Sequence, residues 1–355
     1  MRKLLTLLLT LTTVASASAQ TLKLENGDNI AVIGSGLADR QQHHGNFEAL
    51  IHQSFSEQQL VIRNFGFSGD EVYANLGLAG DKTALKPHRS DEVPTLDYFL
   101  NMAPGDKTEM AGKTSVTYHA GTHFHANVVF AYWGFNESFK GEAGLPDFKV
   151  ALDKFLKVTL AADFGKGKPR VVLFSPLAHE DLKSANFDAN IVANNNKNLG
   201  LYTAAMAEVA KANGVQFVDL FAPSKQLFAA AAQPLTINGI HLTAAGDAAL
   251  APVQFQAVFG KGAPAINANV LANVLEKNTQ WHHRYRTVDQ FNIYGQRSRI
   301  KYEGVDNATV LGRELANRDI KTANHDKGIW ASAQGKATEV KHENLLEPVT
   351  VPPQP

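Results

Sequence analysis

Residues 29–36 read Asn-Ile-Ala-Val-Ile-Gly-Ser-Gly, an apolar run that ends in two glycines on either side of Ser35. A short apolar run that stops at a glycine turn is typical of a buried strand that leads into a helix. Apolar residues at helical spacing follow, at Phe47, Leu50 and Ile51. The segment therefore predicts a strand, a tight turn and a helix, which is the first unit of an α/β fold.

Four later apolar runs have the same character and are separated by helical patterns: Leu60–Phe65, Val128–Trp133, Arg170–Ser175 and Gln216–Leu220. Continuous apolar strands that alternate with helices indicate a parallel sheet with helices on both faces. We therefore predict a flavodoxin-like three-layer α/β/α fold with a central parallel sheet of about five strands.

Two segments interrupt this alternation. Residues 76–127 are rich in Gly, Lys, Thr and His, and are predicted to form a long insertion between the second and third strands. Residues 264–355 are predicted to form a C-terminal extension that ends in a disordered tail. The main domain is then expected over residues 20–263.

The N-terminus has the pattern of a secretion signal. Arg2 and Lys3 precede the apolar run Leu4–Leu11, and Ala17-Ser18-Ala19 offers a small-residue cleavage site. The apolar run is too short to act as a transmembrane anchor. Because the chain has no cysteine, a lipoprotein anchor is excluded. Residues 1–19 are therefore predicted to be a signal peptide, which places the mature protein in the periplasm or outside the cell.

Composition excludes several other classes of function. Lys plus Arg and Asp plus Glu both number 34, so no charge excess favours a nucleic-acid partner. The absence of cysteine excludes disulfides, thiol catalysis and thiolate metal sites. His119, His123 and His125 are closely spaced, but no carboxylate pattern accompanies them. We therefore expect neither a metal site nor a cofactor.

Polar and glycine-rich clusters follow four of the predicted elements: Gly34–Asp39, Asn64–Asp70, Gly134–Glu137 and Asn238–Thr243. In open α/β sheets, ligands bind outside the carboxyl ends of the strands, so these clusters are expected to meet at one edge. Together they supply small turns, amide donors and one histidine. Such groups are what acyl transfer requires: a base and donors for an oxyanion.

The order and spacing of these four clusters resemble the conserved blocks of the SGNH (GDSL-type) hydrolase family, over residues 29–260. The resemblance implies that the backbone N–H of Gly69 and the amide of Asn136 hold the oxyanion, and that His241 is the base. Asn238 stands where the family has the Asp that orients the histidine. An asparagine accepts a hydrogen bond from the ring but stabilises an imidazolium less well.

Four phrases also resemble a secreted subgroup of this family that is common in planctomycetes and verrucomicrobia: Gly36–Arg40, Phe135–Phe139, Phe174–Glu180 and Trp281–Arg286. Because Trp281–Arg286 lies within residues 264–355, the resemblance to this subgroup includes part of the C-terminal extension.

The sequence departs from the family at the nucleophile, because Gly36 occupies the usual serine position. Three interpretations follow. Ser35 attacks the ester if the turn shifts by one residue, or His241 activates water while Gly69 and Asn136 hold the oxyanion. In the third, the site binds a ligand without cleaving it.

Three more residues are predicted to contact the substrate: Glu137, His179 and Glu180. The alternatives are a place in the first turn of a helix for Glu137 and a surface pair for the other two. For Gly69 the alternative is a plain turn glycine, and for Asn136 it is a helix cap.

We therefore predict an exported hydrolase that acts on ester bonds, with a small-molecule or glycan ester as substrate and a carbohydrate O-acetyl group as the candidate. The alternative is a catalytically impaired protein of the same fold that binds a glycan, or that captures a protein partner through residues 264–355.

Overall fold

The structure is a computed structural model that describes residues 21–72, 107–110, 114–117, 124–183, 188–286, 292 and 296–351. The predicted signal peptide and most of the predicted insertion lie outside these residues. None of the helices in the described ranges is long and apolar enough to cross a membrane.

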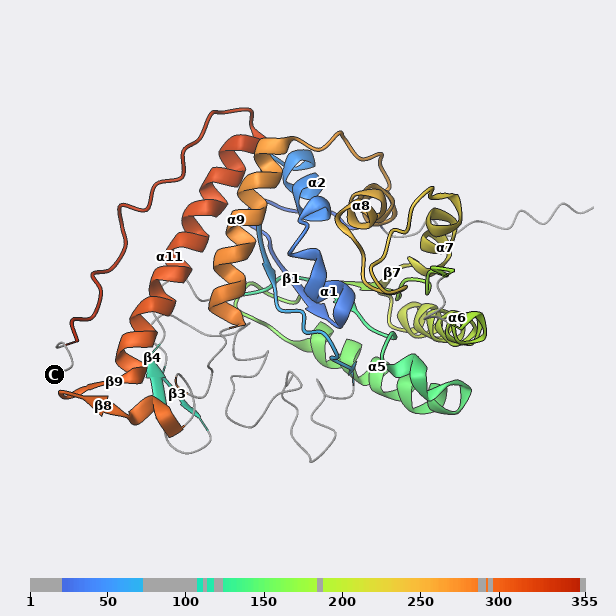
Figure 1. Cartoon of the computed structure of the whole chain (residues 1–355), viewed down its shortest axis with the longest axis horizontal. Coiled ribbons are helices and arrows are strands. Elements are labelled where there is room, and N and C mark those ends of the chain that lie inside the picture. Colours follow the sequence, from blue (N-terminus) through green and yellow to red (C-terminus); the bar gives the residue numbers. More distant parts are fainter. Residues whose placement is uncertain are drawn as a thin grey trace, which may run out of the picture.

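A parallel five-stranded sheet forms the centre of the molecule (Figure 1). Its strands lie in the order β2 (Val61–Asn64), β1 (Asn29–Gly34), β5 (Val128–Tyr132), β6 (Arg170–Phe174) and β7 (Gln216–Val218). This order is that of flavodoxin-like folds. The predicted three-layer fold with about five parallel strands is thus confirmed, and every predicted strand begins within one residue of an observed one.

Helices cover both faces of the sheet. On one face lie α1 (Gly36–Gln41), α2 (Asn46–Ser54) and α8 (Ala244–Phe259), which share a core with Ile30, Phe130 and Phe174. On the other face lie α5 (Leu145–Ala161) and α6 (Ala189–Ala212), which pack on Val129 and Leu173. Both β1 and β5 are buried along their whole length, which explains why both strands are largely apolar on both faces.

Shorter elements connect these layers. Two 3₁₀ helices, η1 (Glu137–Lys140) and η2 (Glu142–Gly144), lead from β5 into α5, and α7 (Phe221–Ala230) follows β7. Within the predicted insertion, β3 (Lys107–Met110) and β4 (Thr114–Thr117) pair antiparallel in a two-stranded sheet of their own.

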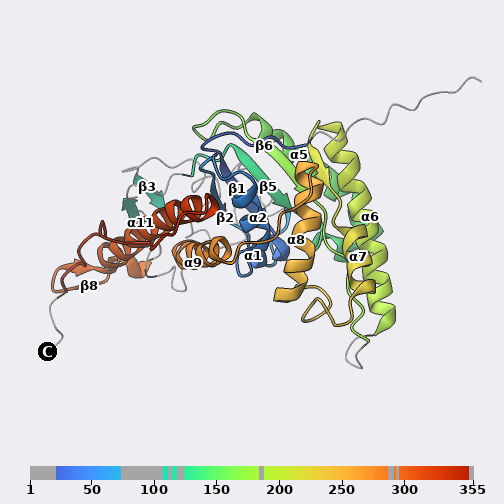
Figure 2. The ribbon, with the colours of Figure 1, turned by 90° about the horizontal axis from the view of Figure 1, so that it is seen from above.

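The C-terminal extension packs against the β2 edge of the sheet. Its long helices α9 (Ala268–Tyr285) and α11 (Asn307–Ala333) lie side by side at that edge (Figures 1 and 2). Between them come η3 (Gln296–Arg299), β8 (Lys301–Tyr302) and β9 (Val305–Asp306). The indole of Trp281 donates to the carbonyl of Asn64 at 2.7 Å, and the hydroxyl of Tyr285 donates to that of Phe65 at 3.2 Å. The extension therefore covers an edge that would otherwise expose strand hydrogen-bonding groups.

Buried charges fasten this extension to the sheet. Lys277 is fully buried, donates to the carbonyl of Ile62 at 2.9 Å and pairs with Glu48 at 2.5 Å. Burial by itself would raise the pKa of Glu48, but the adjacent Lys277 charge lowers it to about 2. Arg63 makes a similar buried pair with Asp326. Breaking one partner of such a pair leaves an uncompensated buried charge, so these contacts tie the extension firmly to the main domain.

Candidate active site

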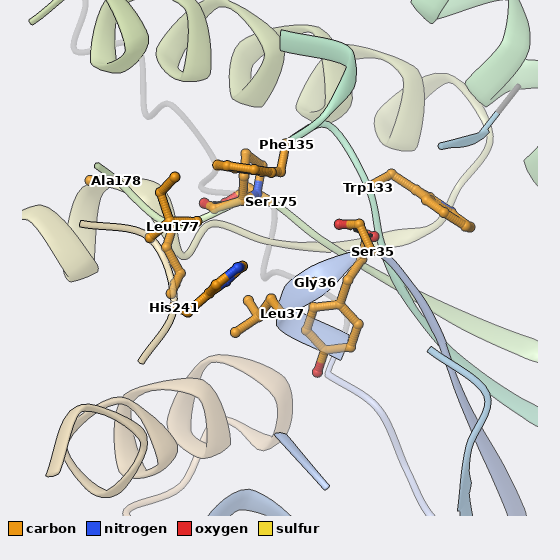
Figure 3. A pocket seen from close by; sticks show the side chains of 12 residues that line it. Ser35, Gly36, Leu37, Trp133, Phe135, Ser175, Leu177, Ala178 and His241 are labelled. Atoms are coloured by element: carbon orange, nitrogen blue, oxygen red, sulfur yellow. Dashed lines mark hydrogen bonds between the residues drawn. The ribbon is translucent and has the colours of Figure 1, made fainter. Parts of the chain in front are cut away.

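The turn after β1 sets the position of the predicted nucleophile region. Ser35 is the N-cap of α1, and its N–H donates to the carbonyl of Tyr132 at 3.0 Å. The Ser35 hydroxyl lies 3.5 Å from the same carbonyl, and the residue is only 2% exposed. Figure 3 shows Ser35 beside Trp133, on the opposite side of the pocket from His241. In the described part of the chain, no hydrogen bond joins Ser35 to that imidazole.

Gly36 instead faces the histidine. A Cβ atom built on Gly36 would lie 3.3 Å from Cε1 of His241 and 3.8 Å from its Nδ1. The hydroxyl oxygen of Ser68 would lie 3.8 Å from the same point. A side chain at residue 36 would therefore point at the imidazole, which is the relation that a nucleophile and its base require.

His241 sits on a loop that its neighbours hold in place. The carbonyl oxygen of the Asn238 side chain accepts from the backbone N–H of His241 at 2.9 Å. The Glu180 carboxylate accepts from the backbone N–H groups of Leu235 and Thr236, at 2.9 and 2.7 Å. The side-chain oxygens of Asn238 and Glu180 thus accept hydrogen bonds from backbone N–H groups of this loop. The sequence predicts a different role for each: Asn238 to orient the ring and Glu180 to bind substrate.

His179 lies beside the same loop, outside the pocket that Ser35 and His241 line. Its Nδ1 is 3.0 Å from the side-chain nitrogen of Asn195, and its backbone N–H donates to Asn196 at 2.8 Å. It lines a neighbouring cavity together with Glu180. Burial lowers the pKa of His179 below its usual value.

The lowered pKa of His241 suits a general base. Burial, and after it the nearby charge of Arg40, lower the pKa of His241 below its usual value of 6.5, while Asp39 acts in the opposite direction. The imidazole is therefore mainly neutral near pH 7 and can accept a proton.

The two predicted oxyanion donors lie on adjoining loops. The side-chain amide of Asn136 donates to the carbonyl of Asp70 at 2.9 Å, next to Gly69 in the chain. Gly69 has a φ of +90°, and a Cβ built on it would meet nothing within 4 Å. Its backbone thus borders open space.

Glu137 connects these two loops through hydrogen bonds. Its carboxylate accepts from the N–H of Val72 at 2.8 Å and from that of Gly134 at 3.0 Å. The residue is 0% exposed, so the structure separates it from the pocket where it was predicted to meet substrate. Burial raises the pKa of Glu137 to about 7.

Sequence reasoning did not single out Asp39, Ser68 or Arg286, which the structure brings together. One oxygen of Asp39 accepts from the N–H and the hydroxyl of Ser68, at 3.1 and 2.7 Å. The other accepts from Gln42 at 3.1 Å and from Arg286 at 3.2 Å. The only signal in the sequence is the position of Asp39, one turn beyond Gly36 on the same short helix.

The pocket at this site is small and largely apolar. Its cavity volume is about 30 Å³, and it is walled by Trp133, Phe135, Leu177 and Ala178, with Gly36 and His241 at its polar side (Figure 3). A pocket of this lining suits a short acyl group more readily than a charged one.

No group of three or more possible metal ligands occurs among the residues that the structure describes. His125 has its Nδ1 2.6 Å from the carbonyl oxygen of Phe164. His119 and His123, the other two members of the spaced triplet, lie outside the described residues.

A parallel α/β sheet with a histidine loop facing the first strand–helix turn places a base at the carboxyl ends of the strands, where open α/β sheets bind their ligands. A model of the GDSL-like lipase/acylhydrolase family matches residues 27–249. The chain belongs to this family, whose members are hydrolases that act on esters. No curated protein matches its sequence.

Several solved structures are similar to it at low identity. "BT4096 a gut microbial diltiazem-metabolizing enzyme" is 17% identical with a TM-score of 0.47, over 68% of this chain and 49% of that one. The chain thus spans about half the length of that enzyme. Axe2, an acetylxylan esterase from Geobacillus stearothermophilus, is 13% identical with a TM-score of 0.45, over 69% and 100%. LAE5, an alpha/beta hydrolase from the metagenome of Lake Arreo, Spain, is 17% identical with a TM-score of 0.42, over 66% and 96%. At these values, the substrates of these proteins do not transfer to this chain.

Proposed function

We propose that this protein hydrolyses an ester of a short acyl group, with His241 as the general base and water as the nucleophile. The observation that carries the proposal is the position of Gly36, whose built Cβ would lie 3.3 Å from the His241 ring. In a serine hydrolase this point belongs to the nucleophilic side chain. Since glycine leaves it open, a water molecule over Gly36 would contact the imidazole.

Two observations support water over Ser35 as the nucleophile. The Ser35 hydroxyl is buried and lies against the carbonyl of Tyr132. To reach His241 it would have to leave this position, and the N–H of Ser35 is itself fixed to the same carbonyl. The shifted-turn mechanism stays a second candidate, and a Ser35 variant tests it directly.

The proposed chemistry is a general-base hydrolysis. Neutral His241 takes a proton from the water as its oxygen attacks the acyl carbon. The N–H of Gly69 and the amide of Asn136 stabilise the oxyanion that forms. The imidazolium then gives its proton to the alkoxide oxygen as the carbon–oxygen bond breaks. The products are a carboxylic acid and an alcohol, and no acyl-enzyme forms.

We further propose an O-acetyl group on a carbohydrate as substrate and the periplasm or the exterior as location. The small apolar pocket supports an acetyl group. Two sequence features support export. Four short segments resemble the secreted planctomycete-type subgroup, and a signal-like pattern precedes Gln20. Carbohydrate specificity rests on analogy within the family.

The test is hydrolysis of p-nitrophenyl acetate by the mature chain beside His241→Ala and Ser35→Ala. Turnover that is lost in His241→Ala and kept in Ser35→Ala supports the water mechanism. Loss in both variants favours the Ser35 mechanism. Equal rates for wild type and His241→Ala would overturn the proposed function and leave ligand binding as the alternative.

A further inference from the structure

Arg40 carries a charge that the described part of the protein does not neutralise. It is half-buried on α1, and its Nε atom is shielded from solvent without a hydrogen-bond partner. No hydrogen bond or ion pair joins its guanidinium to another residue that the structure describes. Keeping an arginine partly buried and unpaired costs free energy, so such a residue in a cavity is a candidate for ligand binding.

The surroundings of Arg40 open onto the proposed active site. It lines a narrow cavity together with His44 and Asp247. Gly36 and His241 line this cavity and also the acyl pocket, so the two spaces adjoin at the reacting position. Gly36 and Arg40 are four residues apart on one helix, and hence on the same face.

Neither neighbouring carboxylate makes an ion pair or a hydrogen bond with Arg40 in the part of the chain that the structure describes. Asp39 is already engaged by Ser68, Gln42 and Arg286. Asp247 accepts from Asn46 at 2.8 Å.

Several histidines and a second arginine lie near Arg40. His44 lines the same cavity with an Nε2 that has no partner in the described residues. Arg286 and His282 interact electrostatically with His43, which adjoins His44 in the chain.

We infer that the substrate is an anionic ester, with a carboxylate, sulfate or phosphate group that pairs with Arg40. This inference rests on the proposed function and adds the substrate class. The apolar pocket takes the acyl group, while Arg40 takes the charge on the alcohol part. The planar guanidinium suits a two-oxygen anion better than a lysine would.

The experiment compares two esters of the same size, 3-acetoxybenzoate (anionic) and 3-acetoxybenzamide (neutral). We expect wild type to prefer the anionic ester in kcat/KM by about tenfold to hundredfold, the range of a charged hydrogen bond. Arg40→Gln should reduce this preference to near unity, and Arg40→Lys should keep part of it. Arg313→Gln, which removes a half-buried charge on α11 that donates to the carbonyl of Glu347, should keep the wild-type preference. The ratio of the two esters cancels any general effect of a variant on folding. An equal preference in wild type and Arg40→Gln, or none in wild type, overturns the inference.

A binding measurement distinguishes failure of the proposed function from failure of the anion site. If neither ester is hydrolysed above the His241→Ala background, calorimetric titration with 3-hydroxybenzoate and 3-hydroxybenzamide tests the anion site alone. Binding of the benzoate by wild type and its loss in Arg40→Gln supports an anionic ligand in a site without ester hydrolysis. Equal binding of both compounds, or no binding of either, counts against the anion site itself.

Discussion

Arg286, the residue that follows α9, donates to Asp39 on α1 at 3.2 Å across 247 residues of sequence. The same guanidinium nitrogen donates to the carbonyl of Gly66 at 3.2 Å, and the group lies 3.6 Å from the ring centre of Phe67. The C-terminal extension thus reaches the loop that carries Gly69. We infer that Arg286 holds that loop beside the first turn.

Arg286→Gln is therefore expected to lower kcat with little change in KM. The loop that presents the Gly69 N–H would lose its restraint, and small misplacements of catalytic groups cost about tenfold to hundredfold in rate. Steady-state kinetics with p-nitrophenyl acetate measures both parameters, and thermal unfolding checks the fold. Arg313→Gln is the matched control for the lost charge. A fall in activity that only follows a fall in Tm would mean that Arg286 has no positioning role.

The buried Lys277 is expected to be essential for stability. Lys277→Ala leaves the Glu48 charge without its partner, and breaking a buried pair costs about 3–5 kcal/mol. Lys149→Ala removes a partly exposed pair with Glu208 and should cost about 1 kcal/mol or less. Urea unfolding of both variants measures the difference. Equal losses would show that the extension is only loosely attached, as the partner-capture alternative requires.

Glu137 is expected to make the protein less stable as the pH rises. Its pKa in the folded state is about 7, above the usual 4.5, so the folded protein keeps a proton that the unfolded chain releases. The resulting stabilisation is complete below pH 4.5 and is lost as the pH rises through about 7, by roughly 3 kcal/mol in all. Unfolding measured across this window should show a steeper decline for wild type than for Glu137→Gln. Parallel curves would contradict the assignment.

The lowered pKa of His241 sets the acid limb of the activity profile. Because the base acts in its neutral form, kcat/KM should rise with pH and level off with a midpoint below 6.5. Arg40→Gln removes a positive neighbour and should move this midpoint up. Asp39→Asn removes a negative one and should move it down. Shifts in the same direction for both variants would mean that these charges do not act on His241.

The sheet could be predicted because its strands are buried on both faces. β5 reads as an uninterrupted apolar run, and such runs between helical patterns leave few alternatives. The position of the C-terminal extension could not be predicted in this way. It depends on pairs such as Lys277 with Glu48, and nothing in the sequence identifies which distant carboxylate a buried lysine will meet.

The sequence predicts the position of the site only as far as the topology of the parallel sheet determines it. The order of the clusters along parallel strands brings Gly36 and His241 to one edge, and the structure has them in contact range. The direction of a polar side chain is a different matter. Glu137 and Glu180 follow strands as pocket residues would, but their carboxylates accept backbone N–H groups, which depends on loop geometry that sequence spacing does not encode.

The most direct test of the Gly36 geometry is to restore the family's nucleophile with Gly36→Ser. Residue 36 is the first residue of α1 and has no left-handed φ, so a serine fits its backbone. Its Cβ would lie 3.3 Å from the His241 ring, which must yield by a few tenths of an ångström. We expect an activity gain of about tenfold or more, since an oriented hydroxyl beside a base replaces a mobile water.

The new hydroxyl should also change the kinetic course of the reaction. Gly36→Ser should show a pre-steady-state burst of p-nitrophenol and should be labelled by a fluorophosphonate at residue 36, which the water mechanism does not allow in wild type. Gly36→Ala is the matched control, because its methyl group meets the same neighbours without a hydroxyl. That methyl fills the place of the water, so this variant should fall below wild type. If the serine variant gains neither burst nor label while its fold is intact, the imidazole of His241 does not face residue 36 in the working enzyme.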